Sequence, residues 1–385
     1  MLKRCVGFIA VLALTALVVA GCGGGSNNSS TTDGGTTDTT DGGTTDGGTT
    51  GTSIQLPRTG QIIGYNLLDD GALQKGVAWP DPRFIDIGDG AVADALNGLI
   101  WAKDASTPTV VSCGGGAKTW QGALDYVACL NSTVYLGYND WILPNINELK
   151  SLIHIQNVLP NLSIGYPFTG VQSGGYWSSS SYANDTGSAW AVGMNGGSVG
   201  FGSKTSGNTY VWPIRAAKWS YSALALPNTG QTISYASGDD GARQRGVPAP
   251  NIRFTTNGDG TVTDKRTGLI WLQNANCWGF KTWSWSFNSV VALANGSCGL
   301  SDGSVAGDWR LPNREELASL VDRSMYGPAL SDGHPFINVQ SGFYWSSSTY
   351  ASDAGGSAWG ASVNVGHEYI NNKVSYYYVW PVRGE

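Results

Sequence analysis

The chain has 385 residues, of which 13% are charged and 11% aromatic, with 55 glycines and 16 tryptophans. This length is enough for two ordinary domains with their own cores, and the aromatic content excludes a chain that is disordered throughout. The formal net charge of −6 at pH 7 disfavours polyanions such as nucleic acid as partners.

Residues 1–21 have the pattern of a bacterial export signal. Lys3 and Arg4 precede an apolar run from Val6 to Ala20 that is too short and too early for a confident membrane span. The run ends in Val-Ala-Gly-Cys, which resembles a lipobox and predicts Cys22 as the lipidated first residue of the mature chain. The alternative is an ordinary signal peptide with an incidental cysteine. Because Gly23 follows rather than Asp, the resemblance predicts anchoring in the outer membrane, facing the periplasm or the cell exterior.

Residues 22–53 are predicted to be a flexible tether. After Cys22 the segment contains only Gly, Ser, Thr, Asn and Asp, so nothing in it can be buried in a core.

The rest of the chain repeats itself. The segment Leu56–Phe84 matches Leu226–Phe254, and Gly88–Trp101 matches Gly258–Trp271. The end of each repeat also matches, as YVWPIR and YVWPVR. We therefore predict one domain over residues 54–215, a linker over 216–225 and a second domain over 226–385.

A strand followed by a capped helix stands in the middle of each repeat. Both copies read Asp-Trp-x-Leu-Pro-Asn-x-x-Glu-Leu-x-x-Leu, so Asn145 and Asn313 are predicted N-caps. Glu148 and Glu316 fall three residues later and complete a capping box.

The other elements follow from local patterns. Gly-Asp-Gly predicts a hairpin, Gly-Leu-Ile-Trp a buried strand, and Thr119 or Thr282 the start of a first helix. The predicted fold class is α+β, with two helices and a small antiparallel sheet in each domain. The LPRTG and LPNTG strings match a sortase signal, but no apolar span and basic tail follow them, so they are predicted strand starts.

Four cysteines remain after Cys5 leaves with the signal and Cys22 is lipidated. They lie two in each repeat and allow three pairings. Repeat symmetry favours Cys113–Cys129 and Cys277–Cys298, each stabilising the fold by about 3 kcal/mol in the chain-entropy model.

The strings GDGTVTDxxTGLIW, KTW, DWRLPNxxEL, YWSSS, SAW and VWPVR together resemble the Lcl C-terminal domain family. The resemblance covers nearly all of both repeats and is closer in the second, since the first has Ile142 where the pattern has Arg and Ala91–Ala95 where it has TVTDK. It implies a fold like that of C-type lectins, hence two tandem C-type-lectin-like domains. It also implies a surface adhesin or glycan binder, because the founding member is linked to adhesion and glycosaminoglycan binding.

Aromatic side chains supply the candidate binding chemistry, because sugar rings stack on exposed rings beside polar groups. Ten tryptophans recur in strand contexts and are predicted core residues: Trp101, Trp141, Trp177, Trp190, Trp212, Trp271, Trp309, Trp345, Trp359 and Trp380. The candidate ligand-binding residues lie in loops, although packing in a minor core is an alternative for each: Tyr166, Phe168, Tyr182, Asn184, Asp185, Tyr326, Phe336, Phe343, Tyr350 and Asp353.

No metal site, cofactor or catalytic centre is predicted. The Gly258–Gly260 turn lacks the alternating oxygen ligands of a calcium loop, and Leu-Pro-Asn stands where calcium-dependent lectins have Glu-Pro-Asn or Gln-Pro-Asp. The three histidines, His154, His334 and His367, do not recur between the repeats.

The predicted function is binding of an extracellular ligand by an adhesin-like surface lipoprotein. The expected partner is a polysaccharide or a cell-surface protein, and the acidic balance favours a neutral glycan over a sulfated one. The alternative is a structural or protein-interaction component of the cell envelope that binds no sugar. A third hypothesis, an enzyme of the formylglycine-generating type, is disfavoured because both cysteines of each repeat precede the second helix.

Overall fold

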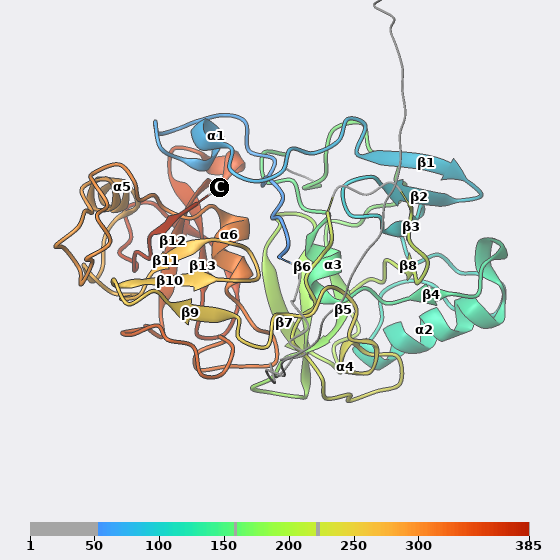
Figure 1. Cartoon of the computed structure of the whole chain (residues 1–385). Helices are drawn as coiled ribbons and strands as arrows, with labels where there is room; N and C mark the ends of the chain where they lie inside the picture. The colour runs from blue at the N-terminus through green and yellow to red at the C-terminus, as the bar shows by residue number, and fades with distance from the viewer. Residues whose placement is uncertain (1–52, 158–159, 221–223, 385) are drawn as a thin grey trace, which may run out of the picture. The chain divides into compact units, whose positions relative to one another are not determined.

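The computed structural model describes residues 53–157, 160–220 and 224–384 (Figure 1). The predicted signal and lipidation site lie outside these residues, and so do the predicted tether apart from Ser53 and part of the predicted linker. None of the helices in the described ranges has the length and apolar character that crossing a bilayer requires.

In its described residues, the first repeat contains three α-helices and eight strands. Its helices are α1 (Asp70–Leu73), α2 (Trp120–Ser132) and α3 (Ile146–Lys150), with the 3-10 turn η1 (Tyr135–Gly137). Its strands are β1 (Phe84–Gly88), β2 (Ala91–Asp94), β3 (Ile100–Ala102), β4 (Trp141–Ile142), β5 (Gly175–Ser181), β6 (Ser188–Gly193), β7 (Val199–Ser203) and β8 (Ile214–Arg215).

The second repeat follows the same order in its described residues, except that it has no strand matching β4 and its 3-10 turn follows the strand β12. Its helices are α4 (Asp240–Arg243), α5 (Trp283–Val291) and α6 (Arg314–Ser319), with the 3-10 turn η2 (Ala351–Asp353). Its strands are β9 (Phe254–Thr256), β10 (Thr261–Asp264), β11 (Ile270–Leu272), β12 (Phe343–Thr349), β13 (Ser357–Ser362), β14 (Glu368–Asn372) and β15 (Val382–Arg383). The chain is thus a mixed helix and sheet protein in two repeated halves.

The predicted capping boxes, first-helix starts and hairpins are confirmed, but the prediction of two helices in each domain is wrong, because a third short helix, α1 or α4, stands near the start of each repeat. Asn145 and Asn313 cap α3 and α6, and Glu148 and Glu316 complete both capping boxes. Thr119 caps α2 with its side chain, whereas Thr282 stands at the same place before α5 without a side-chain hydrogen bond. The Gly-Asp-Gly turns connect antiparallel pairs, β1 with β2 and β9 with β10.

Small antiparallel sheets organise both halves. The five strands of the first sheet run in the order β1-β2-β3-β8-β4, and the matching sheet of the second repeat runs β15-β11-β10-β9. The third sheet runs β12-β13-β14-β7-β6-β5 and contains strands of both repeats, because Glu368 of β14 pairs with Val199 of β7. The two repeats therefore share one sheet.

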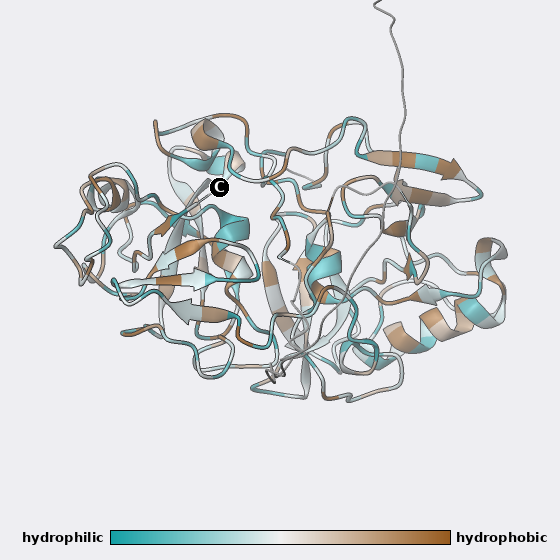
Figure 2. Ribbon diagram, viewed as in Figure 1, coloured by the Kyte–Doolittle hydropathy of each residue, from teal (hydrophilic) through white to brown (hydrophobic). Residues whose placement is uncertain are grey.

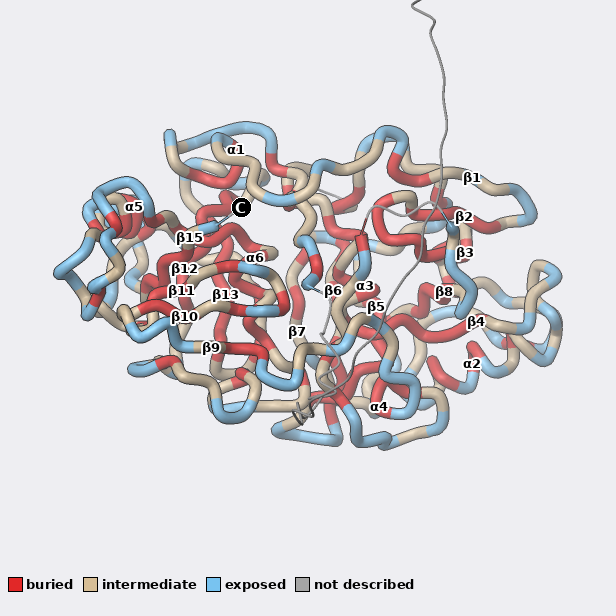
Figure 3. Tube along the Cα trace, in the orientation of Figure 1, coloured by how far each residue is buried: buried red, intermediate tan, exposed pale blue. Residues whose placement is uncertain are grey.

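The tryptophans fill the interior, as predicted. All ten of the recurring ones are at most 1% exposed, and seven of them lie in strands whose central parts are buried in Figure 3. Apolar and polar stretches alternate along α2, which turns one side toward the sheets (Figure 2). The disulfides Cys113–Cys129 and Cys277–Cys298 are both formed, as repeat symmetry indicated.

The start of each repeat packs against the body of the other repeat. We call residues 54–79 segment A and residues 224–249 segment B. Helix α1 of segment A contacts β12, and α4 of segment B contacts β5 (Figure 1). The described parts of both repeats accordingly belong to one compact unit.

Matching hydrogen bonds hold segment A to the second repeat. The Ser348 hydroxyl donates to the buried Asp70 carboxylate at 2.5 Å, and the Thr349 amide donates to Gln61 Oε1 at 2.9 Å. The Asn313 side chain, which caps α6, donates to the Lys75 carbonyl at 3.1 Å.

Segment B makes the same three contacts with the first repeat. The Ser180 hydroxyl donates to Asp240 at 2.5 Å, the Ser181 amide to Gln231 Oε1 at 3.0 Å, and Asn145 to the Arg245 carbonyl at 3.2 Å. The docking is therefore reciprocal.

Because Pro57 and Pro227 form only single bridges, with Val77 and Val247, the prediction that the LPxTG strings start strands is wrong.

A buried charge cluster lies where β14 meets the first repeat. Glu368 is bonded to Lys150 of α3 at 3.0 Å, to Arg314 of α6 at 2.9 Å and to Arg323 at 3.3 Å. Burial opposes ionisation of Glu368, but the three cations outweigh it and hold its pKa well below the ordinary value. Lys150 also pairs with Glu315 at 3.1 Å.

Replacing Glu368 by Gln is expected to lower the free energy of unfolding by about 3–5 kcal/mol, because the buried Arg314 and Arg323 lose their counter-ion. Urea denaturation of the purified chain measures this change. Glu315→Gln is the matched control, since it removes another partner of Lys150 from a more exposed position and should cost about 1 kcal/mol or less. Equal losses in the two variants would contradict the role of the cluster.

The docking carboxylates predict a pH dependence of stability. Burial raises the pKa of Asp70 to about 7 and that of Asp240 to about 6, with smaller contributions from Glu316 and Glu148. The neighbouring Asp69 and Asp239 add to the same direction. Since the folded-state values lie above the unfolded value of 3.8, this contribution is fully present below pH 3.8 and is lost as the pH rises through the folded values.

As the pH rises from about 5 to about 8, the free energy of unfolding should therefore fall less in the variant Asp70→Asn/Asp240→Asn than in the wild type. Urea midpoints at several pH values check this difference. Parallel pH profiles for the two proteins would show that these carboxyl groups do not titrate as inferred.

Candidate functional site

A surface groove lies where segment B meets the first repeat. We call it groove 1, and its volume is about 460 Å³. Its lining comes from the start of α2, the β5–β6 loop, the end of β7 and segment B, namely Thr119, Trp120, Gln121, Thr186, Lys204, Thr205 and Tyr235.

Lys204 is the central cation of groove 1. Its ammonium lies 3.9 Å from the ring centroid of the buried Trp120 and 5.0 Å from that of Tyr235. It donates to the Ser181 hydroxyl at 2.7 Å. Burial lowers the pKa of Lys204, while Asp239 and Asp185 act in the opposite direction.

The second repeat carries a matching cluster with segment A. The Lys373 ammonium lies 3.8 Å from the Trp283 ring centroid and 5.7 Å from that of Tyr65. It donates to Thr349 at 3.1 Å and to the Ala354 carbonyl at 2.7 Å. Burial also lowers the pKa of Lys373.

The N-cap residues of α1 and α4 position the two tyrosines. The backbone amide of Tyr65 donates to Asp69 at 2.7 Å, and that of Tyr235 donates to Asp239 at 2.6 Å. Tyr65 is 39% exposed and Tyr235 42% exposed. Among the exposed aromatic residues of the described chain, they form the pair that recurs at matching positions of the repeats.

This arrangement suits a polar ligand with an apolar face. A tyrosine ring offers a flat surface to the C–H face of a sugar, while lysine, threonine and glutamine side chains bond hydroxyl groups. Groove 1 offers both kinds of group, since Tyr235, Lys204 and Gln121 line it together.

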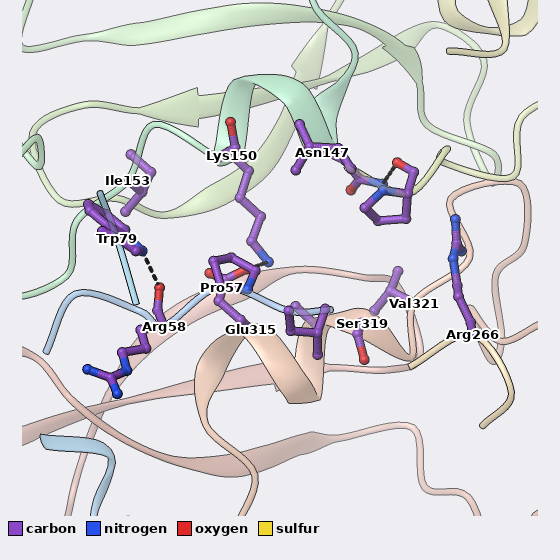
Figure 4. A pocket seen from close by; sticks show the side chains of 15 residues that line it. Pro57, Arg58, Trp79, Asn147, Lys150, Ile153, Arg266, Glu315, Ser319 and Val321 are labelled. Atoms are coloured by element: carbon purple, nitrogen blue, oxygen red, sulfur yellow. Dashed lines mark hydrogen bonds and ion pairs between the residues drawn. The ribbon is translucent and has the colours of Figure 1, made fainter. Parts of the chain in front are cut away.

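A smaller cavity of about 60 Å³ lies between α3 and α6, close to both LPxTG strings (Figure 4). Its polar groups already bond one another: Lys150 pairs with Glu315 at 3.1 Å, and Trp79 donates to the Arg58 carbonyl at 2.7 Å. Asn147 donates to the Pro227 carbonyl at 3.1 Å. At ~30 Å³ for one water molecule in the liquid, this space holds roughly two waters.

Several of the predicted ligand-binding aromatics lie in the core. Phe168 and Phe336 are each 6% exposed and pack at equivalent places against Trp212 and Trp380. Tyr182 is 4% exposed and stacks on Phe201. Because their rings are covered by neighbours, these three residues present no open face to a ligand.

The half-buried aromatic candidates also pack against other aromatic rings. Tyr166 lies beside Phe168, Tyr350 lies edge-on to Trp359, and Phe343 contacts Tyr369 and Tyr377. Tyr326 is 54% exposed and is not among the residues that line groove 1.

The predicted polar residues lie in the loops beside the Lys204 and Lys373 clusters. Asn184 is exposed, and Asp185 accepts hydrogen bonds from Ser188 and from the Gly187 amide. Asp353 makes the same two kinds of bond, with Ser357 and Gly356. The two aspartates are near enough to affect the pKa of Lys204 and Lys373.

The described residues contain no group of three or more His, Cys, Asp or Glu side chains arranged to hold a metal ion. His154 and His367 pack separately against Trp79 and Trp190. Burial lowers the pKa of both histidines to about 4, so both are neutral at pH 7.

The sequence comparisons agree with this architecture. A family model of the Lcl C-terminal domain matches residues 90–215 and again residues 260–383. The chain therefore belongs to the Lcl C-terminal domain family and contains two tandem copies, as the motifs predicted. This family points to a surface or adhesin-like protein. No curated protein sequence matches the chain.

The central residues of the two clusters were not among the predicted site residues: Tyr65, Tyr235, Lys204 and Lys373. Their signal was the recurrence of Tyr four residues before Asp-Asp-Gly and of Lys after β7 and β14. The tyrosines lie outside the two matched family ranges and come from segments A and B.

Proposed function

We propose that this chain is a lipid-anchored surface protein whose two repeats bind a neutral glycan in an adhesin-like role. The observation that supports this proposal best is the pair of equivalent tyrosine–lysine–tryptophan clusters. Each combines a partly exposed tyrosine ring with a lysine held over a buried tryptophan.

The charges around the clusters favour a neutral ligand. Asp185 and Asp239 face Lys204, and Asp69 and Asp353 face Lys373. Each lysine is therefore offset by two carboxylates, and neither cluster offers the grouped cations that a sulfated chain requires. Hydroxyl-rich polysaccharides fit this balance better than glycosaminoglycans.

Two sites on one chain suit adhesion to a repetitive surface. A polymer engaged by both clusters would bind more tightly than either cluster alone, provided that the geometry allows both to bind at once. The proposal places the chain at the outer membrane, held by a lipid on Cys22 and spaced from the membrane by residues 23–53. It involves no catalytic step and no cofactor.

A second candidate function is contact with another envelope protein. The second repeat exposes apolar side chains that the first lacks: Phe280 is 54% and Tyr376 66% exposed, where the first repeat has Ala117 and Asn208. Crosslinking on intact cells tests this candidate, because a protein partner would be captured through these residues.

Replacing Tyr65 or Tyr235 by Ala is expected to weaken binding to a glycan-array hit about tenfold, since one stacking surface is lost. The double variant should lose the additional gain from two-site binding. Surface plasmon resonance with the immobilised glycan measures both effects.

Tyr376→Ala is the matched control, because Tyr376 is an exposed tyrosine that lies outside the two clusters. Its affinity should equal that of the wild type. No binding by the folded chain to any neutral glycan on the array would overturn the sugar proposal and leave the protein-contact candidate.

The anchoring proposal has its own test. Cells that express the chain should incorporate an alkyne-labelled fatty acid into it, and Cys22→Ser should abolish the labelling. Labelling that persists in the Cys22→Ser variant would disprove lipidation at this residue.

A further inference from the structure

Docking of segment A leaves a cavity of about 300 Å³ against the second repeat. Its walls are mainly apolar. Leu68 and Leu73 come from segment A, and Phe287, Val290 and Val291 come from α5. This volume lies at the lower end of the range of small-molecule pockets.

The charged groups at this cavity, with one exception, have partners. Arg310 bonds Glu316 through two contacts of 2.6 Å, and Arg383 pairs with Asp302 at 2.8 Å. Asp308 accepts a hydrogen bond from the Val305 amide at 2.8 Å.

The exception is the half-buried Lys75. Its ammonium makes no hydrogen bond or ion pair with any residue in the described part of the chain. Lys75 also lines an adjoining cavity of about 430 Å³, together with Leu56, Leu73 and Glu316. The unpaired cation therefore stands between two cavities.

Comparison of the repeats explains the surplus charge. At the matching joint of the first repeat, Ile142 replaces Arg310, so Glu148 is free to pair with Arg245 of segment B at 2.8 Å. Lys75 is the counterpart of Arg245, but its carboxylate, Glu316, is already bonded to Arg310. At this junction of the second repeat, Lys75 is therefore a cation without a carboxylate partner among the described residues.

We propose that this cavity binds a small amphiphilic carboxylate. The apolar chain lies against Leu68, Phe287 and Val290, and the carboxylate pairs with Lys75 at the rim. At the ~30 Å³ that one water molecule fills, the cavity holds roughly ten heavy atoms, about the size of octanoate. Burial of the chain supplies the affinity, and the charge-assisted bond to Lys75 selects an anion over a neutral analogue.

Isothermal titration calorimetry of the full chain with octanoate and with octanamide tests the proposal. The two probes have the same number of heavy atoms and differ in charge. Octanoate should bind at least about fivefold more tightly than octanamide. Equal affinity, or no binding of octanoate, would overturn the proposal.

Two variants locate the site. Lys75→Gln should remove the preference for octanoate, while Lys218→Gln, an exposed lysine outside the cavity, should preserve it. Val291→Phe should fill the cavity and abolish binding of both probes. If Val291→Phe does not fold, the Lys75→Gln result alone decides, since an unchanged preference in that variant would refute the assignment.

Discussion

The structure depends on two buried aspartate side chains, each of which is hydrogen-bonded to a residue of the opposite repeat. Asp70 and Asp240 each accept a short hydrogen bond from a serine of the opposite repeat, and Thr59 or Thr229 bonds the same oxygen from within the segment. Buried carboxyl groups are costly unless hydrogen bonds satisfy them. The two segments are therefore fixed to the bodies on which they dock, and neither repeat is completed by its own chain segment alone.

The docking is symmetric in its backbone contacts but not in its charges. The first repeat has Val199 where the second has the buried Glu368, and Ile155 where the second has Arg323. One set of buried ions therefore serves the whole junction, and the matching positions of the other repeat remain apolar. This division avoids the placing of like charges on both sides of the shared sheet, where desolvation would penalise each of them.

Local patterns made much of the fold predictable. The capping boxes at Asn145 and Asn313 need only neighbours within one helical turn, and the tryptophans needed only their alternation along strands. The exchange of segments was not predictable, because Asp-Asp-Gly-Ala has the same form whichever body it docks on. The choice depends on contacts such as Ser348–Asp70 and Ser180–Asp240, which join residues far apart in the sequence.

The same reason limited prediction of the site. Loop aromatics such as Phe168 and Phe336 were reasonable candidates by sequence. In the folded chain, however, the ring of each packs edge-to-face against a tryptophan ring. Tyr65 and Tyr235 gain their place only because segments A and B bring them beside lysines of the opposite repeat. Where segments A and B dock, the two repeats differ in side chains although their backbone contacts are alike. A matching pair of clusters can then coexist with an unmatched cavity, since Leu68 and Leu73 of segment A stand where segment B has Gly238 and Arg243.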